Sequence, residues 1–264
     1  MKLAAAIATE DVSRIVRLLS DVIQRGAEPI IERRRYFMQG IAELIDAKRW
    51  MWAHSKLDAN GAPAFFANIT DGWSESELTV ISRITLTPAF AAAVNARFGH
   101  LMCREHFTAF QTESVDDGDF EPGESPLVAW REAGFVDWVW TFDPLGGTTL
   151  SAAAFHRGPG QARFTIRERT ILHTVMSQVD WLHREGTDVV GTDRITELTP
   201  RQRMVLLQLL SGDSVKEIAS KLNLSQHTIN DHLKELHRIY GVSSRSELLA
   251  RFIAGRPDAT SSPS

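Results

Sequence analysis

The pattern of hydrophobic positions after residue 198 predicts four short helices that share one small core. In the first three of these helices the apolar residues that fall on one face are Val205, Leu206, Leu209 and Leu210, then Ile218, Ala219 and Leu222, then Ile229, Leu233, Leu236 and Tyr240. Only residues 223–225 join the second helix to the third, so these two helices must cross sharply. This arrangement is a helix-turn-helix.

Capping residues mark where these helices begin. A threonine or serine followed three residues later by Gln or Glu forms a reciprocal pair, in which each side chain accepts a hydrogen bond from the other residue's backbone N–H. This pattern occurs at Thr199, Ser214 and Ser244. Ser225 caps the third helix without such a partner, because Thr228 holds the third position.

The third helix carries a polar face opposite its apolar stripe. That face consists of His227, Asn230, Asp231, Lys234 and Arg238. Such a face on a surface helix is usually only solvated. Here, however, the free N–H groups at the helix start can face a phosphate, an asparagine can pair with adenine, and a lysine can reach guanine. Because an α-helix presented by a short turn fits the major groove, we expect this face to bind DNA.

Residues 198–252 resemble the LuxR-type (GerE-like) helix-turn-helix domain. The matching positions are Leu198, Thr199, Arg201, Gly212, Glu217, Ile218, Ala219, Leu222, Ser225, Thr228, His232, Gly241, Val242 and Arg245. The resemblance implies a four-helix DNA-binding domain of a transcriptional regulator, with the third helix in the major groove of double-stranded DNA and the fourth at a dimer contact. It places Asn230, Asp231 and Lys234 at base-facing positions, and Gln226, His227, Thr228 and His232 near phosphates. Lys216 and Arg238 complete the candidate DNA-binding set.

Three departures from the family pattern affect the expected affinity. Gln202 replaces a usual Glu, and Asn230 and Ile239 stand where lysine is frequent. Each missing cation removes one potential phosphate contact and so about 0.9 from the slope of affinity against salt. We therefore expect modest affinity. Asp231 either accepts from a cytosine amino group or repels phosphate, and the sequence leaves both interpretations open.

The segment 1–186 alternates helical and strand patterns. We expect helices over about 15–23, 30–45, 76–98 with a break at Thr87–Pro88, 125–132 and 165–185, and hairpins over about 49–72 and 135–157. Two hairpins framed by helices predict one antiparallel sheet covered by helices, an α+β fold. The element order is similar to GAF/PAS-like sensor domains. A receiver domain and an acyl-homoserine-lactone domain fit worse, because the first lacks its opening strand and the second its Trp/Tyr/Asp pattern.

Four tryptophans are candidates for binding a small molecule. Trp50 and Trp52, and Trp138 and Trp140, occupy alternate strand positions, so each pair shares a face and is able to line a pocket. The competing interpretation is that they fill the core.

Other chemistry is not indicated. Cys103 and His106 have a metal-like spacing but lack a second pair of ligands. The acidic cluster Asp116, Asp117 and Asp119 lacks the spacing of a calcium loop and is expected to be a mobile loop. We find no cofactor or catalytic motif, so we predict no cofactor and no enzyme activity.

Charge and composition restrict where nucleic acid binds. The 264-residue chain has a net charge of -4, yet Lys and Arg outnumber Asp and Glu by 10 to 8 from residue 190 onward. Nucleic-acid binding is therefore expected only in the C-terminal part. With one cysteine, no secretory signal and no apolar run long enough for a membrane span, we expect a cytoplasmic protein without membrane contact.

Taken together, the sequence divides into a sensor or interaction domain at 1–186, a linker at 187–197, a DNA-binding domain at 198–254 and a disordered tail at 255–264. It predicts a sequence-specific transcriptional regulator that acts as a homodimer and whose N-terminal domain senses a small molecule or a partner. The alternative is a constitutive DNA-tethered interaction protein without a small-molecule effector.

Overall fold

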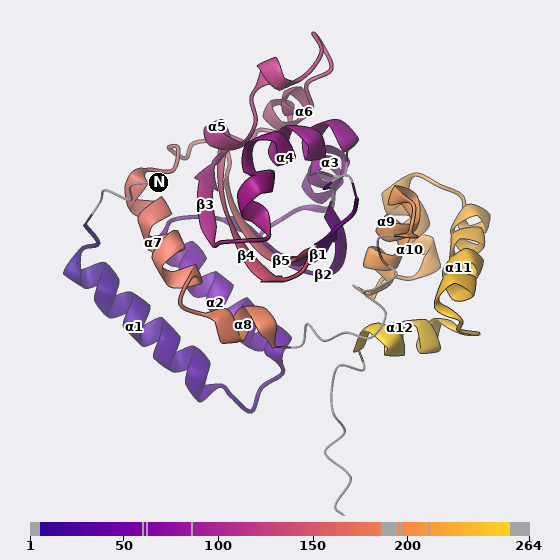
Figure 1. Ribbon diagram of the computed structural model, residues 1–264, viewed down its shortest axis with the longest axis horizontal. Helices are drawn as coiled ribbons and strands as arrows, with labels where there is room; N and C mark the ends of the chain where they lie inside the picture. The colour runs from indigo at the N-terminus through magenta and orange to yellow at the C-terminus, as the bar shows by residue number, and fades with distance from the viewer. Residues whose placement is uncertain are drawn as a thin grey trace, which may run out of the picture.

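The N-terminal part of the chain is built on one antiparallel sheet (Figure 1). The computed structural model describes residues 6–253 except 60, 62, 86, 186–194, 196 and 211, and omits the side chains of residues 66, 67, 82, 200 and 250–253. The strands are β1 (Arg49–Leu57), β2 (Pro63–Asp71), β3 (Phe107–Phe110), β4 (Asp137–Gly146) and β5 (Thr149–Arg157), in the order β2-β1-β5-β4-β3. The two predicted hairpins, β1–β2 and β4–β5, are confirmed. β2 and β3 form the edges.

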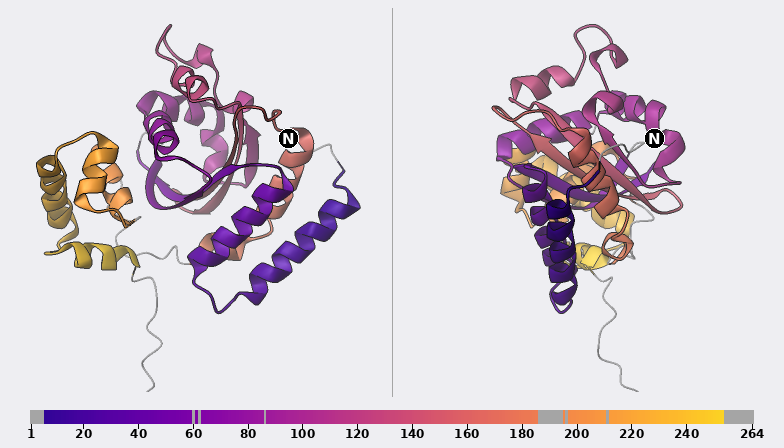
Figure 2. Two further views of the ribbon diagram at one scale, coloured as in Figure 1. Left: turned by 180° about the vertical axis from the view of Figure 1, so that it is seen from behind. Right: turned by 90° about the vertical axis from the view of Figure 1, so that its left-hand side faces the viewer.

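One face of the sheet is covered by the first and last helices of this domain. These are α2 (Ile30–Leu44), α7 (Ile166–Met176) and α8 (Asp180–Arg184), with α1 (Thr9–Gln24) packed outside α2 (Figures 1 and 2). Their apolar side chains form a core with Trp50, Trp52, Val139 and Phe155 from the strands. We call this side the packed face.

The opposite face carries the helices between the two hairpins. They are α3 (Glu75–Thr85), α4 (Pro88–Met102) and α6 (Leu127–Glu132), which enclose a second core with Trp138, Phe142 and Leu150. Thr87 caps α4 by accepting from the backbone N–H of Phe90 at 3.2 Å, which confirms the predicted break. We call this side the cavity face. The α+β prediction is therefore correct, with helices on both faces of the sheet.

Two predictions need correction, one for the acidic loop and one for the last helix of this domain. The stretch after β3 forms α5 (Gln111–Ser114) and a 3-10 turn, η1 (Asp117–Asp119), and the acidic cluster is tied down by ion pairs of Asp119 with Arg97 and of Asp117 with Arg131. The single helix expected over 165–185 is broken into α7 and α8.

The break has a tertiary cause. Thr165 and Glu168 form the expected capping box, so the helix starts as predicted. After Met176, however, the chain turns so that the ring of His183 contacts Asp143 and Ser151 of the sheet and also comes back to the Met176 carbonyl oxygen, 3.1 Å from Nε2. Neither Gly nor Pro marks this turn in the sequence.

The C-terminal helices are α9 (Pro200–Leu210), α10 (Val215–Leu222), α11 (Gln226–Tyr240) and α12 (Arg245–Ile253). Their stripes meet in one core, as predicted, which also contains Ile195, Leu198 and Leu248. Ala64 of β2 belongs to the same core, because α9 packs against this edge strand. The linker and tail predictions fall largely on residues 186–194 and 254–264, outside the described residues.

No single helix among the described residues is long and apolar enough to cross a membrane. The bent pair α3 and α4 passes that test only when its two helices are joined, on length and composition.

Candidate nucleic-acid interface and effector cavity

The turn between α10 and α11 is built from two local signals. Asn223 ends α10 in the left-handed conformation, at φ 52°, which asparagine tolerates better than most residues. Ser225 then caps α11 by accepting from the backbone N–H of Thr228 at 3.0 Å. The box at Ser214 and Glu217 fixes the start of α10 in the same way. These caps hold the two helices at the crossing that a helix-turn-helix requires.

α11 is divided sharply into a buried and an exposed face. Ile229, Leu233, Leu236 and Tyr240 are all at most 7% exposed. On the other side, the side chains of His227, Lys234 and Arg238 are 85%, 73% and 71% exposed. Asn230 and Asp231 are also exposed. The structure therefore brings the predicted polar face together on the surface.

The cations of this face are paired with acids of the same helix. The Lys234 ammonium lies 2.9 Å from an Asp231 carboxylate oxygen, and His227 lies 3.4 Å from the other oxygen. Arg238 pairs with Glu235 one turn further on. The hydrogen bond from Lys234 holds the pKa of the Asp231 carboxyl below its usual value, and Arg238 does the same for the pKa of Glu235. Exposed pairs of this kind contribute little to stability, so a phosphate or a base edge can replace the acid.

The remaining candidate residues surround this face. Gln226 is exposed at the first turn of α11, with Thr228 half-buried beside it. His232 is also half-buried. Lys216 is exposed in the first turn of α10, where the preceding helix of a helix-turn-helix approaches the DNA backbone.

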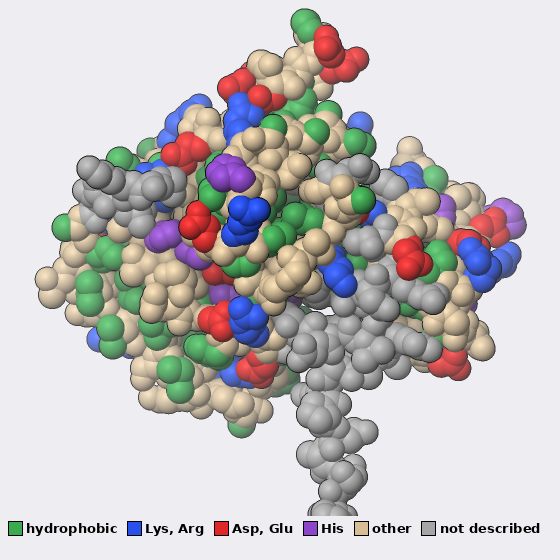
Figure 3. All heavy atoms as spheres, in the orientation of Figure 1, with side chains coloured by type: hydrophobic (Ala, Val, Ile, Leu, Met, Phe, Trp, Pro, Cys, Tyr) green, Lys and Arg blue, Asp and Glu red, His purple; other side chains and the backbone are tan. Residues whose placement is uncertain are grey.

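The N-terminal domain does not cover the polar face. In both Figure 1 and Figure 2, α9 and α10 stand between α11 and the sheet, and α11 lies on the far side. Figure 3 shows charged and histidine side chains gathered on this outer edge. A DNA duplex therefore has access to α11 in the arrangement seen here.

A cavity of about 100 Å³ lies on the cavity face, between the sheet and α4. Its lining contains no charged side chain: Met51, Ala53, Ser55, Gly61, Pro63, Phe65, Thr85, Phe90, Ala91, Val94, Met102, Trp140, Phe142, Leu150, Ala152, Ala153 and Ala154. The indole N–H of Trp140 is buried and makes no hydrogen bond with the described part of the chain. It is a donor without an acceptor beside an apolar space.

The four candidate tryptophans divide between the two faces. As predicted, each pair shares a face. Trp50 and Trp52 lie on the packed face, where their indole N–H groups donate to Gln39 at 3.3 Å and to Ser151 at 2.6 Å. Trp138 lies on the cavity face against Trp130 and Trp140, and Trp140 alone of the four lines the cavity. Trp50 and Trp52 are therefore core residues whose indole N–H groups are hydrogen-bonded, whereas Trp140 is a cavity residue.

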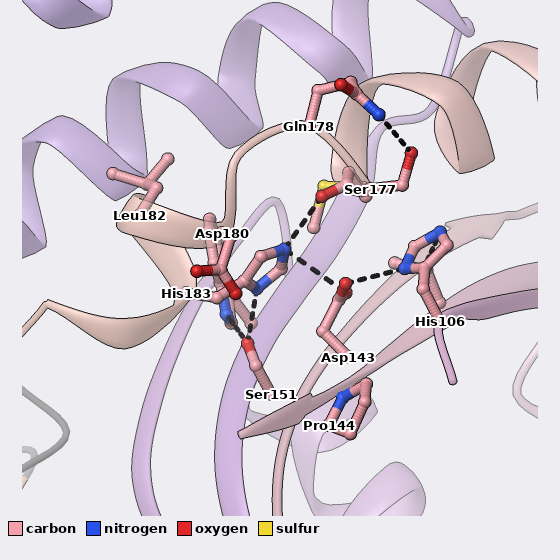
Figure 4. Close-up of polar contacts among 12 residues, drawn as sticks. His106, Asp143, Pro144, Ser151, Ser177, Gln178, Asp180, Leu182 and His183 are labelled. Carbon is pink, nitrogen blue, oxygen red and sulfur yellow. Dashed lines mark hydrogen bonds and ion pairs between the residues drawn. The ribbon is translucent and has the colours of Figure 1, made fainter. Parts of the chain in front are cut away.

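A group of polar side chains that the sequence did not reveal joins α8 to the sheet through hydrogen bonds and an ion-pair contact (Figure 4). Asp143 of β4 lies 2.6 Å from His106 Nδ1 and 3.2 Å from His183 Nε2, while His183 Nδ1 lies 2.8 Å from the Ser151 hydroxyl. On its other side, the His183 carbonyl contacts His54 at 3.0 Å. Burial lowers the pKa of His183 and lowers the pKa of His54 still further. We call these residues the histidine cluster.

Ser151, His183 and Asp143 share the connectivity of a hydrolase triad, but their setting differs. Ser151 is fully buried, and its hydroxyl oxygen already accepts from Trp52. A nucleophile must reach its substrate, and this hydroxyl is enclosed by the packed face. The cluster holds α8 in place instead.

Cys103 and His106, whose spacing resembles that of a metal site, make separate contacts in the structure. His106 belongs to the histidine cluster, and Cys103 is a half-buried free thiol packed beside the cavity-face core. Within the described ranges, no three His, Cys, Asp or Glu side chains are grouped so that they could hold a metal ion.

Comparison with known proteins identifies the C-terminal helices. Residues 196–252 match the model of the family described as "Bacterial regulatory proteins, luxR family". They form a LuxR-type helix-turn-helix domain. This match includes α9 to α11 and nearly all of α12, and so confirms the resemblance found in the sequence.

Curated relatives extend the comparison only in part. The chain is 38% identical over 60 residues to the probable HTH-type transcriptional regulator GfsR of Streptomyces halstedii, which is 23% of this chain and 24% of that protein. It is 28% identical over 153 residues to the transcriptional activator protein BjaR1 of Bradyrhizobium diazoefficiens, which is 56% of this chain and 61% of that protein. The chain therefore spans less than two thirds of either relative. The names of both relatives describe regulators of transcription.

A crystal structure of SdiA from Escherichia coli is similar to most of the chain at 15% identity. The alignment covers 91% of this chain and 95% of SdiA, with a TM-score of 0.45. The likeness of the N-terminal domain to GAF/PAS-like domains stays a prediction.

Proposed function

We propose that the chain is a cytoplasmic, sequence-specific DNA-binding regulator of transcription that acts as a homodimer. The observation that carries the proposal is the polar face of α11, which is exposed on a LuxR-type helix-turn-helix domain, while the apolar stripe of the same helix is buried. In this role Asn230, Asp231 and Lys234 contact base edges, and Lys216, Gln226, His227, Thr228, His232 and Arg238 contact phosphates.

The intrahelical ion pairs then become part of recognition. In the free protein Asp231 neutralises Lys234. On DNA, Lys234 exchanges Asp231 for a guanine edge or a phosphate, and Asp231 is left to accept from a cytosine amino group or to oppose a backbone phosphate. The first outcome favours one class of sequence over others, and the second weakens binding to every sequence.

A selection experiment tests the proposal without knowledge of the target. The purified full chain is incubated with random DNA duplexes, and the bound fraction is amplified and sequenced over several rounds. We expect an enriched motif with two related half-sites, and an affinity that falls linearly with the logarithm of the salt concentration. Absence of enrichment together with a flat salt response would overturn the proposal. A monomeric mass of the protein on the selected duplex, measured by light scattering, would overturn the homodimer.

We further propose that the cavity beside Trp140 is the effector site. A cavity without charged side chains, next to one unpaired N–H donor, suits an uncharged, mostly apolar molecule with a single hydrogen-bond acceptor. The two satisfied tryptophans of the packed face have no part in this site.

Ligand screening distinguishes this from a constitutive interaction protein. The probes are uncharged, mostly apolar compounds with one carbonyl group, such as esters and ketones of graded chain length. We expect some of them to raise the melting temperature of the wild-type chain and to have a smaller effect on Trp140→Phe, which keeps a ring but lacks the N–H. No shift with any probe, and unchanged DNA affinity in their presence, would favour the constitutive alternative.

A further inference from the structure

Strand β2 separates the cavity from the DNA-binding domain. Pro63 and Phe65 line the cavity. Ala64, the residue between them, is fully buried in the core formed by α9 to α12. Because successive residues of a strand point to opposite faces, three consecutive residues place one strand in contact with both sites. Figures 1 and 2 show the C-terminal helices beside this edge of the sheet.

A second contact holds α9 to the same end of the hairpin. Asp58 follows β1 in the turn that leads to β2, and its carboxylate lies 3.5 Å from the Arg203 guanidinium of α9. Both side chains are largely buried, at 18% and 12% exposure. Arg203 also donates to the Leu198 carbonyl at 3.0 Å, so its position is fixed within the DNA-binding domain. We call Ala64, Asp58 and Arg203 the docking contact.

The cavity is too small for an ordinary ligand unless a wall moves. Its volume of about 100 Å³ is below the roughly 300–1,000 Å³ of typical ligand pockets. β5 and β4 form the inner part of the wall and have neighbours on both sides, whereas β2 is an edge strand paired only with β1. The pairing of β2 also shifts immediately after Phe65, where residue 66 has no partner on β1. A bulge interrupts the ladder locally, so among the strands of the wall the segment Pro63–Phe65 yields most easily.

We propose that filling the cavity displaces the segment Pro63–Phe65 and loosens the docking contact, which frees the DNA-binding domain to take a new position relative to the sensor domain. The proposal rests on the proposed effector site. Well-packed contacts resist gradual deformation, so a small shift of Ala64 breaks the contact rather than stretching it. Because α11 is already exposed, the docking contact does not determine whether DNA can reach the polar face. It determines the position of that face within a dimer.

A substitution that fills the cavity tests the coupling without any ligand. Ala91 lines the cavity from α4. In full-length Ala91→Phe we expect amide hydrogen exchange in 198–210 to rise by about fivefold or more, the lower end of ordinary coupling between sites. Exchange in 226–240 should change less. The milder Ala91→Leu keeps the test usable if the phenyl ring prevents folding.

Two control variants show whether a change in amide exchange comes from filling the cavity. Ala129→Phe adds the same ring at an exposed position on α6 and should leave exchange in 198–210 unchanged. Ala64→Glu attacks the docking contact directly and should raise exchange in 198–210 at least as much as Ala91→Phe. If Ala64→Glu raises exchange while Ala91→Phe and Ala91→Leu, both folded, do not, the coupling is wrong.

Ligand data separate failure of this inference from failure of the effector site. A probe that raises the melting temperature without changing exchange in 198–210 would overturn the coupling and leave the effector site standing. Conversely, if no probe binds but Ala91→Phe loosens α9, the coupling stands and the effector site fails.

Discussion

The two domains use their polar side chains in opposite ways. In the N-terminal domain, His54, Asp143 and His183 are at most 8% exposed and are bound to one another or to their neighbours. On α11, His227 and Lys234 are more than 70% exposed, and their partner Asp231 lies on the same helix.

The difference indicates what each set does. A buried polar group must keep its partners, because an unpaired one costs about 1–3 kcal/mol, so such a group fixes the fold. An exposed ion pair is worth little and exchanges its partner readily. Substitutions in the first set should change stability, and substitutions in the second should change binding.

The largest effect is expected for Asp143→Ala. This change leaves His106 without its carboxylate partner at 2.6 Å and removes the carboxylate that lies 3.2 Å from His183 Nε2, so it should lower the free energy of unfolding by about 3 kcal/mol. Urea denaturation of the full chain measures the loss. An unchanged transition midpoint would show that the cluster does not hold α8 to the sheet.

Acidification should destabilise the N-terminal domain by a comparable amount. Burial lowers the pKa of His156 from 6.5 to about 3, so the unfolded chain takes up a proton first as the pH falls, and stability present above pH 6.5 is lost below it. Between pH 7 and pH 5 this residue alone should remove about 2 kcal/mol. Denaturation at several pH values should give a shallower pH dependence for His156→Phe. Equal pH dependence in both proteins would contradict the prediction.

The two tryptophan pairs should respond differently to loss of the indole N–H. Trp52→Phe removes a 2.6 Å hydrogen bond within the packed core and should cost about 2 kcal/mol. Trp140→Phe removes no hydrogen bond to the described chain and borders a space, so it should cost less than about 1 kcal/mol. Urea midpoints of the two variants, compared side by side, test this order. The reverse order would remove the distinction between a satisfied core pair and a cavity residue.

The smallest effect on stability is expected on α11. Asp231→Asn removes an exposed carboxylate that only pairs with its own helix, so the melting temperature should not change measurably. A clear drop in the melting temperature would mean that the polar face stabilises the fold.

The sequence predicted the DNA-binding domain well because its signals are local. The boxes at Thr199 and Ser214 and the cap at Ser225 involve residues three apart, and all three form as expected. At Ser244 the cap also forms, with Glu247 accepting instead from the backbone N–H of Ser243.

Features that depend on long-range contacts could not be predicted from the pattern of residues along the sequence. The turn between α7 and α8 depends on His183 reaching Met176 and Asp143, which no local signal encodes. Alternation correctly placed each tryptophan pair on one face, but only the packing of α4 decides which face holds a cavity. Likewise, the burial of Ala64 under α9 joins positions more than 130 residues apart.

The central claim is that the polar face of α11 reads DNA, and the most direct test compares Lys234→Ala with Arg17→Ala on the selected duplex. Arg17 is an exposed cation on α1 in the other domain and serves as the matched control. The account predicts that Lys234→Ala binds about tenfold more weakly, with a salt slope shallower by up to about 0.9, and that Arg17→Ala binds like the wild-type chain. Equal affinities for the two variants, at equal melting temperatures, would contradict it.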